Sequence, residues 1–164
     1  MSIRDKLKSI HISDFKVDDI TIKEITTEKE LGYATVILKL KPEQENLVNP
    51  AGFSIGRAFL NPADNIPCII YKDNNEPIGF ISLCKWSGSG DAYSWSYFID
   101  KNYQNMGYGT KAAKLAIHIL KTADPNMKIK LAVENCNIKA QSLYISIGFS
   151  KTYELDGDDF VYSL

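Results

Sequence analysis

The sequence predicts a mixed α/β fold, in which helices lie on a mixed sheet. Segments with the two-residue period of strands and the 3.6-residue period of helices follow the order β-α-α-β-β-β-α-β-α-β-β. The three strands in the middle are joined by short turns, as antiparallel neighbours are. The later strands alternate with helices, which adds a crossover to the same sheet.

The 164 residues suffice for one domain with a sizeable core. We divide the chain into an N-terminal arm, residues 1–18, that is loosely docked, and a single domain, residues 19–164. A net charge of −1 provides no field that would recruit nucleic acid or an acidic membrane. No run approaches the roughly 18 apolar residues of a membrane span, and the first residues lack a signal-peptide core. We therefore expect a cytoplasmic protein without a nucleic-acid or membrane partner.

The first half of the domain predicts one strand and two helices. Residues 19–25 alternate apolar and polar side chains and favour a strand. Thr27 and Glu30 form a capping box, which starts a helix that should run to about Leu40. A shorter helix should follow Asn49-Pro50 and end near Leu60, before a second Asn-Pro pair.

The second half predicts a strand meander followed by alternating strands and helices. Turns rich in Asn and Gly separate the meander strands, and Asn137 and Gly148 suit the start and the end of the last helix. The expected strands cover residues 66–73, 77–86, 92–100, 128–134, 149–155 and 160–164, and the expected helices cover 110–123 and 137–148.

The three cysteines, Cys68, Cys84 and Cys136, show no CxxC spacing and have no histidine in metal register. We interpret them as reduced, buried, small apolar residues, and we expect no metal site.

The stretch YQNMGYG, residues 103–109, joins the third meander strand to a helix and presents two glycines there. It is not a Walker phosphate loop, which needs GxxxxGK[ST]. Gly107, Gly109 and Ala112 do satisfy GxGxx[GA], the dinucleotide fingerprint. However, three hairpin-linked strands precede this motif and only one crossover unit follows it, an order that cannot build a doubly wound sheet. A plain glycine turn before a helix is the remaining structural alternative.

The same stretch, read from Gln104, resembles the [QR]xxGx[GA] pyrophosphate loop of the GCN5-related N-acetyltransferases. Bare backbone amides at a helix start suit a phosphate, because the helix dipole also favours negative charge there. That family's second signature, N-x-x-A-x-x-L-Y-x-x-x-G-F, has matches at Asn137, Ala140, Leu143, Tyr144, Gly148 and Phe149. The resemblance covers residues 20–164.

The resemblance implies a mostly antiparallel sheet with a central splayed parallel pair, flanked by helices, and acetyl-CoA as co-substrate. The cofactor arm would pair with the backbone of residues 97–99, and an amide near Phe98 would polarise the acetyl carbonyl. The implied cofactor-binding residues are Phe98, Ile99, Gln104, Asn105, Met106, Gly107, Tyr108, Gly109, Thr110, Asn137 and Tyr144.

For catalysis, the resemblance implies that Tyr144 is the acid that protonates the departing thiolate. A buried aromatic without a chemical role is the alternative for this residue. The base stays open. Many family members carry a glutamate near the position of Ser94, and a hydroxyl cannot replace it unaided. Asp91 and Glu134 are carboxylates that could act through water, although both could equally be solvated surface acids.

The acceptor is expected to be a small-molecule primary amine. The hairpin of residues 69–83, the run from residue 98 to 115 and the C-terminal residues resemble bacterial spermine/spermidine acetyltransferases of the diamine type. Relatives commonly show an arginine where Ser96 stands and a lysine in the glycine loop. A polyamine site needs carboxylates and aromatic faces, for which we name Glu43, Asp91, Trp95 and Glu134.

Other readings of the acceptor and of the protein stay open. The aromatics at positions 93, 95 and 97 could instead be core residues. Another small amine, such as an aminoglycoside or an amino-acid derivative, is the next acceptor class, followed by a protein N-terminus or lysine. A non-catalytic acetyl-CoA sensor is the alternative outside enzymology. Homodimers are common in the family, and the sequence does not decide the oligomeric state.

Overall fold

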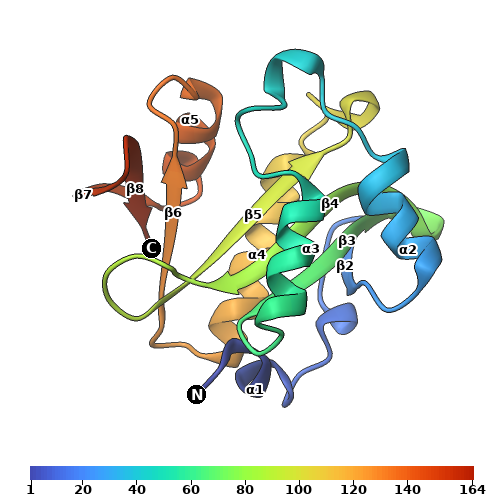
Figure 1. The fold of residues 1–164 in the computed structure, drawn as a ribbon, viewed down its shortest axis with the longest axis horizontal. Coiled ribbons are helices and arrows are strands. Elements are labelled where there is room, and N and C mark those ends of the chain that lie inside the picture. The colour runs from blue at the N-terminus through green and yellow to red at the C-terminus, as the bar shows by residue number, and fades with distance from the viewer.

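The computed structural model describes residues 1–164, apart from the side chain of Asn74. Its described residues form an eight-stranded sheet in the order β1-β2-β3-β4-β5-β6-β8-β7. The neighbours pair antiparallel except for β5 and β6, which are parallel. The mixed α/β fold predicted from the sequence, with one central parallel pair, is confirmed (Figure 1).

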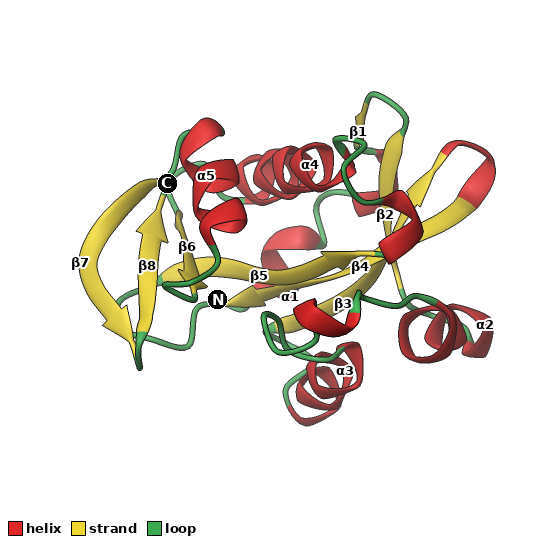
Figure 2. Cartoon of the chain, turned by 90° about the horizontal axis from the view of Figure 1, so that it is seen from above, coloured by secondary structure: helices red, strands yellow, loops and turns green.

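The strands are β1 Lys16–Val17, β2 Ile20–Glu24, β3 Asn65–Lys72, β4 Glu76–Lys85, β5 Ala92–Ile99, β6 Lys128–Val133, β7 Ser150–Asp156 and β8 Asp159–Ser163. The α-helices are α1 Ile3–Leu7, α2 Glu28–Gly32, α3 Ala51–Leu60, α4 Tyr108–Ala123 and α5 Ile138–Ser146. Helices α4 and α5 cover one face of the sheet, and α2 and α3 cover the other (Figure 2). Within the described residues, none of the helices is long and apolar enough to cross a membrane.

Helix α4 forms the centre of the larger core. Its alanines Ala112, Ala113 and Ala116 are fully buried, which lets the helix lie close to the sheet, and Leu120 is buried with them. Ile117 of the same helix is only half-buried. On the opposite face of the sheet a smaller apolar cluster packs beneath the segment that runs from α2 to α3.

The first predicted helix starts as expected and ends earlier. Thr27 and Glu30 form the capping box in both directions. Helix α2 then widens into a π-helical turn, Tyr33–Ile37, and the backbone becomes extended at Leu38. The predicted end at about Leu40 was therefore wrong, because Leu38 leaves the helix to bury its side chain in the smaller cluster.

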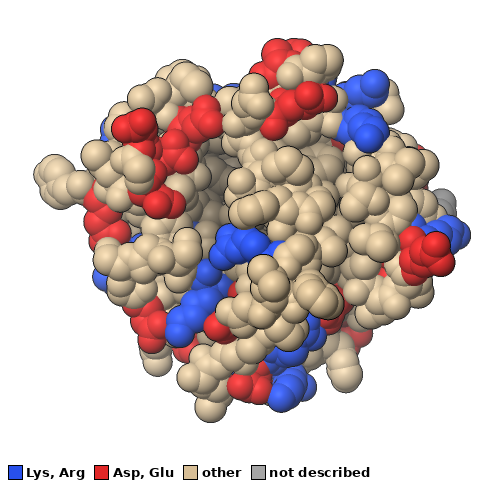
Figure 3. Space-filling view, viewed as in Figure 1, with Lys and Arg blue, Asp and Glu red and all other residues tan. Residues whose placement is uncertain are grey.

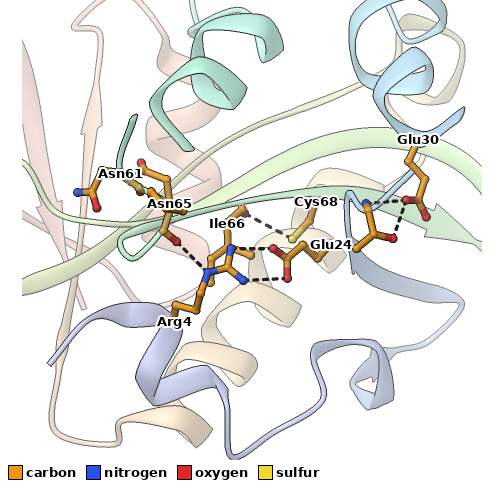
Figure 4. A network of polar contacts seen from close by, with 9 residues as sticks. Arg4, Glu24, Glu30, Asn61, Asn65, Ile66 and Cys68 are labelled. Carbon is orange, nitrogen blue, oxygen red and sulfur yellow. Dashed lines mark hydrogen bonds and ion pairs between the residues drawn. The ribbon is translucent and has the colours of Figure 1, made fainter. Parts of the chain in front are cut away.

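The N-terminal segment is held more firmly than the loosely docked arm we expected. Ile3 and Leu7 of α1 belong to the larger core, and Ile3 is fully buried. The guanidinium of Arg4 donates to both carboxylate oxygens of Glu24, at 2.7 and 3.3 Å, and its Nε donates to the carbonyl of Pro62 at 2.8 Å. The segment is thus joined to β2 and to the loop before β3 (Figure 4).

We expect Arg4→Ala to lower the free energy of unfolding by about 1 kcal/mol, because a two-pronged ion pair and a hydrogen bond are lost. Both side chains of the pair are about a third exposed, at 35% and 33%, which keeps the effect small. Denaturant unfolding would measure it. Lys8→Ala is the matched control, since its ion pair with Asp5 is more exposed and should contribute little. Equal losses in the two variants would contradict the docking role of Arg4.

Candidate active site

The two parallel strands at the centre of the sheet diverge along their length. β5 and β6 pair only at Ala92↔Lys128 and Tyr93↔Ile129, next to the start of each strand. From Ser94 onward β5 has no partner on that side in the described residues. The sheet therefore opens into a wedge between β5 and β6 (Figure 1).

The backbone groups that face this wedge follow from the pairing of β5 with β4. The amide of Asp100 donates to Ile78, and the carbonyl of Ala92 accepts from Trp86, so even-numbered residues of β5 are bonded to β4. Successive residues of a strand point their amides to opposite sides. The amides of Trp95, Tyr97 and Ile99 therefore face the wedge. That of Phe98, which we expected to offer to a ligand, faces β4 instead.

The glycine loop ends at the N-terminus of α4, beside the wedge. Gly107 is the N-cap and has a left-handed backbone, with φ of +83°. No side chain caps the first amides of the helix, and its first turn holds no acidic residue. A Cβ at Gly107 would meet nothing within 4 Å, so open space lies before the helix end. Uncapped amides beside open space form a site that suits an anion.

Side chains beside the loop complete this end of the site. Gln104 donates its Nε2 to the carbonyl of Ile99 at 3.0 Å and to Gln44 at 2.7 Å. Its Oε1 is buried and has no partner among the described residues. Lys139 of α5 reaches across to the loop and donates to Asn105 at 2.7 Å. The sequence reasoning missed this cation, which lies within the second signature and stands where it can replace the absent loop lysine.

A cavity of about 540 Å³ runs from the glycine loop along the wedge and out over the other face of the sheet. Figure 3 shows the molecule hollowed on that face. Most residues predicted for the site line this cavity: Trp95, Phe98, Ile99, Gln104, Asn105, Gly107, Gly109, Thr110, Glu134, Asn137 and Tyr144. Met106 and Tyr108 of the loop do not, and neither do Glu43 and Asp91.

Tyr144 lies in the wall of the wedge, on α5, with 7% of its surface exposed. Its ring packs against Trp95 at 6.3 Å and against Phe149 at 5.6 Å between centroids. Burial raises the pKa of Tyr144 well above its ordinary value, while the indole of Trp95 and the hydroxyl of Tyr97 act in the opposite direction. Tyr144 therefore holds its proton at neutral pH.

Strand β5 provides no base at the position of Ser94. Ser94 is 7% exposed and lies opposite Cys84 in the sheet, with its hydroxyl against that thiol. Burial raises the pKa of Cys84 to about 11, so the thiol is neutral. Cys68 is buried as well, but Cys136 is exposed, contrary to our expectation, because it lies in the loop after β6.

Three carboxylates line the cavity in the described residues, of which Glu134 was predicted and the other two were not. Glu134, after β6, is joined by Asp156 and Asp159 from the turn between β7 and β8. We call these three residues the acidic rim. Burial, and then the charges of Glu134, Asp156 and Asp158, raise the pKa of Asp159. The four acids in the stretch ELDGDD were the available signal.

The other predicted acceptor acids lie elsewhere. Asp91 pairs with Lys85 at 3.0 Å, and Glu43 lies exposed in the short turn Pro42–Gln44. Arg57 of α3 and Lys85 line the cavity as well, so the cavity has a basic part in addition to the acidic rim. Acidic and basic side chains both border the hollow in Figure 3. Across the described residues, no three His, Cys, Asp or Glu side chains gather as metal ligands would.

Comparison with known proteins gives a family and a fold. The family model described as "Acetyltransferase (GNAT) family" matches residues 34–149. No curated protein matches the chain.

Solved structures with the same fold cover most of the chain. A proposed ribosomal-protein-serine acetyltransferase from Vibrio cholerae is 18% identical, with a TM-score of 0.66, and the match covers 94% of this chain and 99% of that one. RimJ of Mycobacterium smegmatis, in complex with CoA-disulfide, is 15% identical with a TM-score of 0.69, over 88% and 81%. The GNAT domain of S. lividans PAT is 10% identical with a TM-score of 0.69, over 88% and 89%. At these identities the likeness shows the fold alone.

Proposed function

This chain belongs to the GNAT acetyltransferase family, and from that premise we propose that it acetylates a primary amine of a polyamine such as spermidine or spermine. Acetyl transfer follows from the family, whose acetyl donor is acetyl-CoA. The polyamine acceptor is our inference from the acidic rim. We infer further that the reaction occurs by direct attack of the amine while both substrates are bound.

The residues of the wedge fit the proposed donor. The uncapped amides at the start of α4 would hold its pyrophosphate, with Lys139 adding a positive charge. The free edge of β5 would pair with the arm as an added strand does, through the amides of Trp95, Tyr97 and Ile99. Asn137 lines the wedge, but its side-chain oxygen already caps α5 by accepting from Ala140, which leaves its side-chain amide to donate to the arm. Acetyl-CoA supplies the thioester whose carbonyl carbon the amine attacks.

The chain then has three tasks in the transfer. An amide of β5 that faces the wedge would stabilise the charge on the carbonyl oxygen, and the amides of Trp95 and Tyr97 are the candidates. Tyr144 gives its proton to the sulfur that leaves, since it is protonated at neutral pH. The amine must lose a proton before it attacks. For this step we propose water held by Glu134 or Asp159, because Ser94 and Cys84 cannot accept a proton.

The observation that carries the polyamine proposal is the acidic rim. No lysine or arginine pairs with Glu134, Asp156 or Asp159 in the described residues. Burial raises the pKa of Asp159 most, and repulsion from the charges of Glu134, Asp156 and Asp158 raises it further. An acceptor with several ammonium groups would relieve that repulsion. One ammonium would bind at the rim while a neutral amine enters the wedge.

One observation favours a second acceptor class. Arg57 lines the same cavity and has no ion-pair partner among the described residues. An acceptor with both an amine and a carboxylate, such as an amino-acid derivative, could use Arg57 and the acidic rim together. A protein amine is the third class, and the Vibrio cholerae structure is named for a ribosomal-protein acceptor.

A thiol-release assay with acetyl-CoA tests the function. The amines would be spermine, spermidine, putrescine, an aminoglycoside, lysine and a short peptide. We expect saturable turnover with spermidine or spermine. Turnover with lysine or the peptide alone would replace the polyamine by the second or third class. Binding of acetyl-CoA without turnover of any amine would favour a sensor.

We expect the double variant Glu134→Gln, Asp159→Asn to raise KM for spermidine by about tenfold or more. Each of the two half-buried carboxylates would lose its charge contact with an ammonium group, and each loss weakens binding modestly. KM for acetyl-CoA should stay unchanged. Glu43→Gln and Asp91→Asn are matched controls, since these acids do not line the cavity. Spermidine should also raise the Tm of the wild type more than that of the double variant. Equal KM values in all four proteins would contradict the acidic rim as the acceptor site.

A further inference from the structure

The indole N–H of Trp95 is a buried donor without an acceptor. Trp95 is 5% exposed, and its Nε1 has no partner in hydrogen-bond geometry among the described residues. Burying a donor unpaired costs stability, and such groups in native proteins call for a reason. Trp95 lines the wedge, so we expect the acceptor for its N–H to lie there.

The surroundings fix the indole in one orientation. Its ring meets those of Tyr144 and Phe149 edge to face, at 6.3 and 5.9 Å, with interplanar angles of 64° and 87°. All three residues belong to the larger core. The ring contact with Tyr144 brings the tyrosine hydroxyl near the indole N–H, and the indole lowers the pKa of Tyr144 against the larger effect of burial. A small closing movement would turn this approach into a hydrogen bond.

Tyr144 needs such a partner if it is the acid. Its burial makes the tyrosinate costly, so giving up the proton requires a donor on the oxygen left behind. The hydroxyl of Tyr97 is one candidate, but it already donates to the carbonyl of Gly109 at 3.2 Å. An indole N–H can only donate, so it cannot take the proton away and favours the tyrosinate alone.

We propose that Trp95 is a positioning residue for Tyr144, whose indole N–H closes onto the tyrosine oxygen as the tyrosine proton leaves for the departing sulfur. In that step the O–H bond of Tyr144 breaks and an S–H bond forms. The negative charge passes from the sulfur to the tyrosine oxygen, where the indole N–H stabilises it. The inference rests on the acid role of Tyr144 in the proposed function.

The charged and titratable groups of the surrounding elements do not offer the same help. Tyr97 of β5 is the titratable group in contact with Tyr144. The charged groups that line the same cavity are Glu134, Lys139, Arg57, Lys85, Asp156 and Asp159. Burial raises the pKa of Tyr144 most, and among the described residues the indole of Trp95 and the hydroxyl of Tyr97 lower it.

The first test observes the contact without turnover. The chain has two tryptophans, Trp86 and Trp95, so a ¹⁵N-labelled sample shows two indole N–H signals, which Trp95→Phe assigns. We expect Tyr144→Phe, which keeps the ring and removes the hydroxyl near the indole N–H, to change the chemical shift of the Trp95 indole proton. The Trp86 indole, which lies against Gly88 in the hairpin loop, should not move. An unmoved Trp95 signal would overturn the proposal.

The second test is kinetic. We expect Trp95→Phe to lower kcat by about tenfold or more, with KM for acetyl-CoA and for the amine unchanged, as a lost hydrogen bond to an ionised group does. In a Tyr144→Phe background the same change should have little further effect. A rise in amine KM at constant kcat would make Trp95 an acceptor contact and overturn the proposal. If no amine is acetylated, the proposed function fails, while the indole signal still decides this inference.

Discussion

We expect Tyr144→Phe to lower kcat by about a hundredfold or more, because general acid catalysis contributes factors of that size. The variant keeps the aromatic ring that packs against Trp95 and Phe149 and loses only the hydroxyl. Acetyl-CoA binding should therefore change by less than about twofold, since no interaction with the bound donor depends on the proton. Steady-state kinetics and calorimetry would separate the two effects.

Tyr162→Phe is the matched control for this substitution. Tyr162 is also a buried tyrosine, and its hydroxyl donates to Gln141 at 3.1 Å rather than lining the cavity. The control should lose a little stability and no activity. A Tyr144→Phe enzyme with the full wild-type rate would remove Tyr144 from the acid role and leave it as a core aromatic.

The second large effect concerns the glycine loop. We expect Gly107→Val to raise the dissociation constant of acetyl-CoA by about a hundredfold or more, because a side chain would stand before the amides that we propose bind the pyrophosphate. The left-handed backbone at Gly107, φ +83°, adds a loss of about 1–2 kcal/mol in stability for a residue with a Cβ. Calorimetric titration at a temperature well below the Tm would measure binding in folded protein.

Two further variants separate the strain from the blockage. Gly90→Val carries the same strain, because Gly90 also has a left-handed backbone, with φ of +80°. Gly90 lies in the loop between β4 and β5 and does not line the cavity. The variant should lose stability and bind acetyl-CoA normally. Gly107→Asn tolerates the left-handed backbone and still fills the space before the helix, so it should lose binding with little loss of stability. Normal binding by Gly107→Asn would contradict the anion site.

Local patterns in the sequence were enough to predict most of the fold. The capping box at Thr27 and Glu30, the N-cap at Asn137 and the left-handed Gly148 were all found where the sequence indicated. The two caps depend on residues three apart, so the local sequence specifies them without reference to distant contacts. The early end of the helix at Leu38 could not be predicted, because a distant apolar cluster decides it.

In the candidate site, too, some residues could be predicted from local motifs and others could not. The glycine loop and the second signature placed Gly107 and Tyr144 on the cavity, because a loop or a helix carries each motif as a unit. Lys139 was not predicted, although it lies inside the second signature, since only the packing of α5 brings it to Asn105. The amide of Phe98 was wrongly chosen because its direction depends on the register of β5 against β4.

Short spacings along the chain thus specify the fold, the family and the loop at the start of α4. Which carboxylates line the cavity depends instead on long-range packing. Glu43 and Asp91 are as acidic as Asp156 and Asp159, yet Asp91 pairs with Lys85 and Glu43 lies outside the cavity. The turn between β7 and β8 lies near Glu134 because β8 pairs with β6 and is placed between β6 and β7 in the sheet. Residues more than twenty positions apart meet there through strand order, which no local pattern specifies.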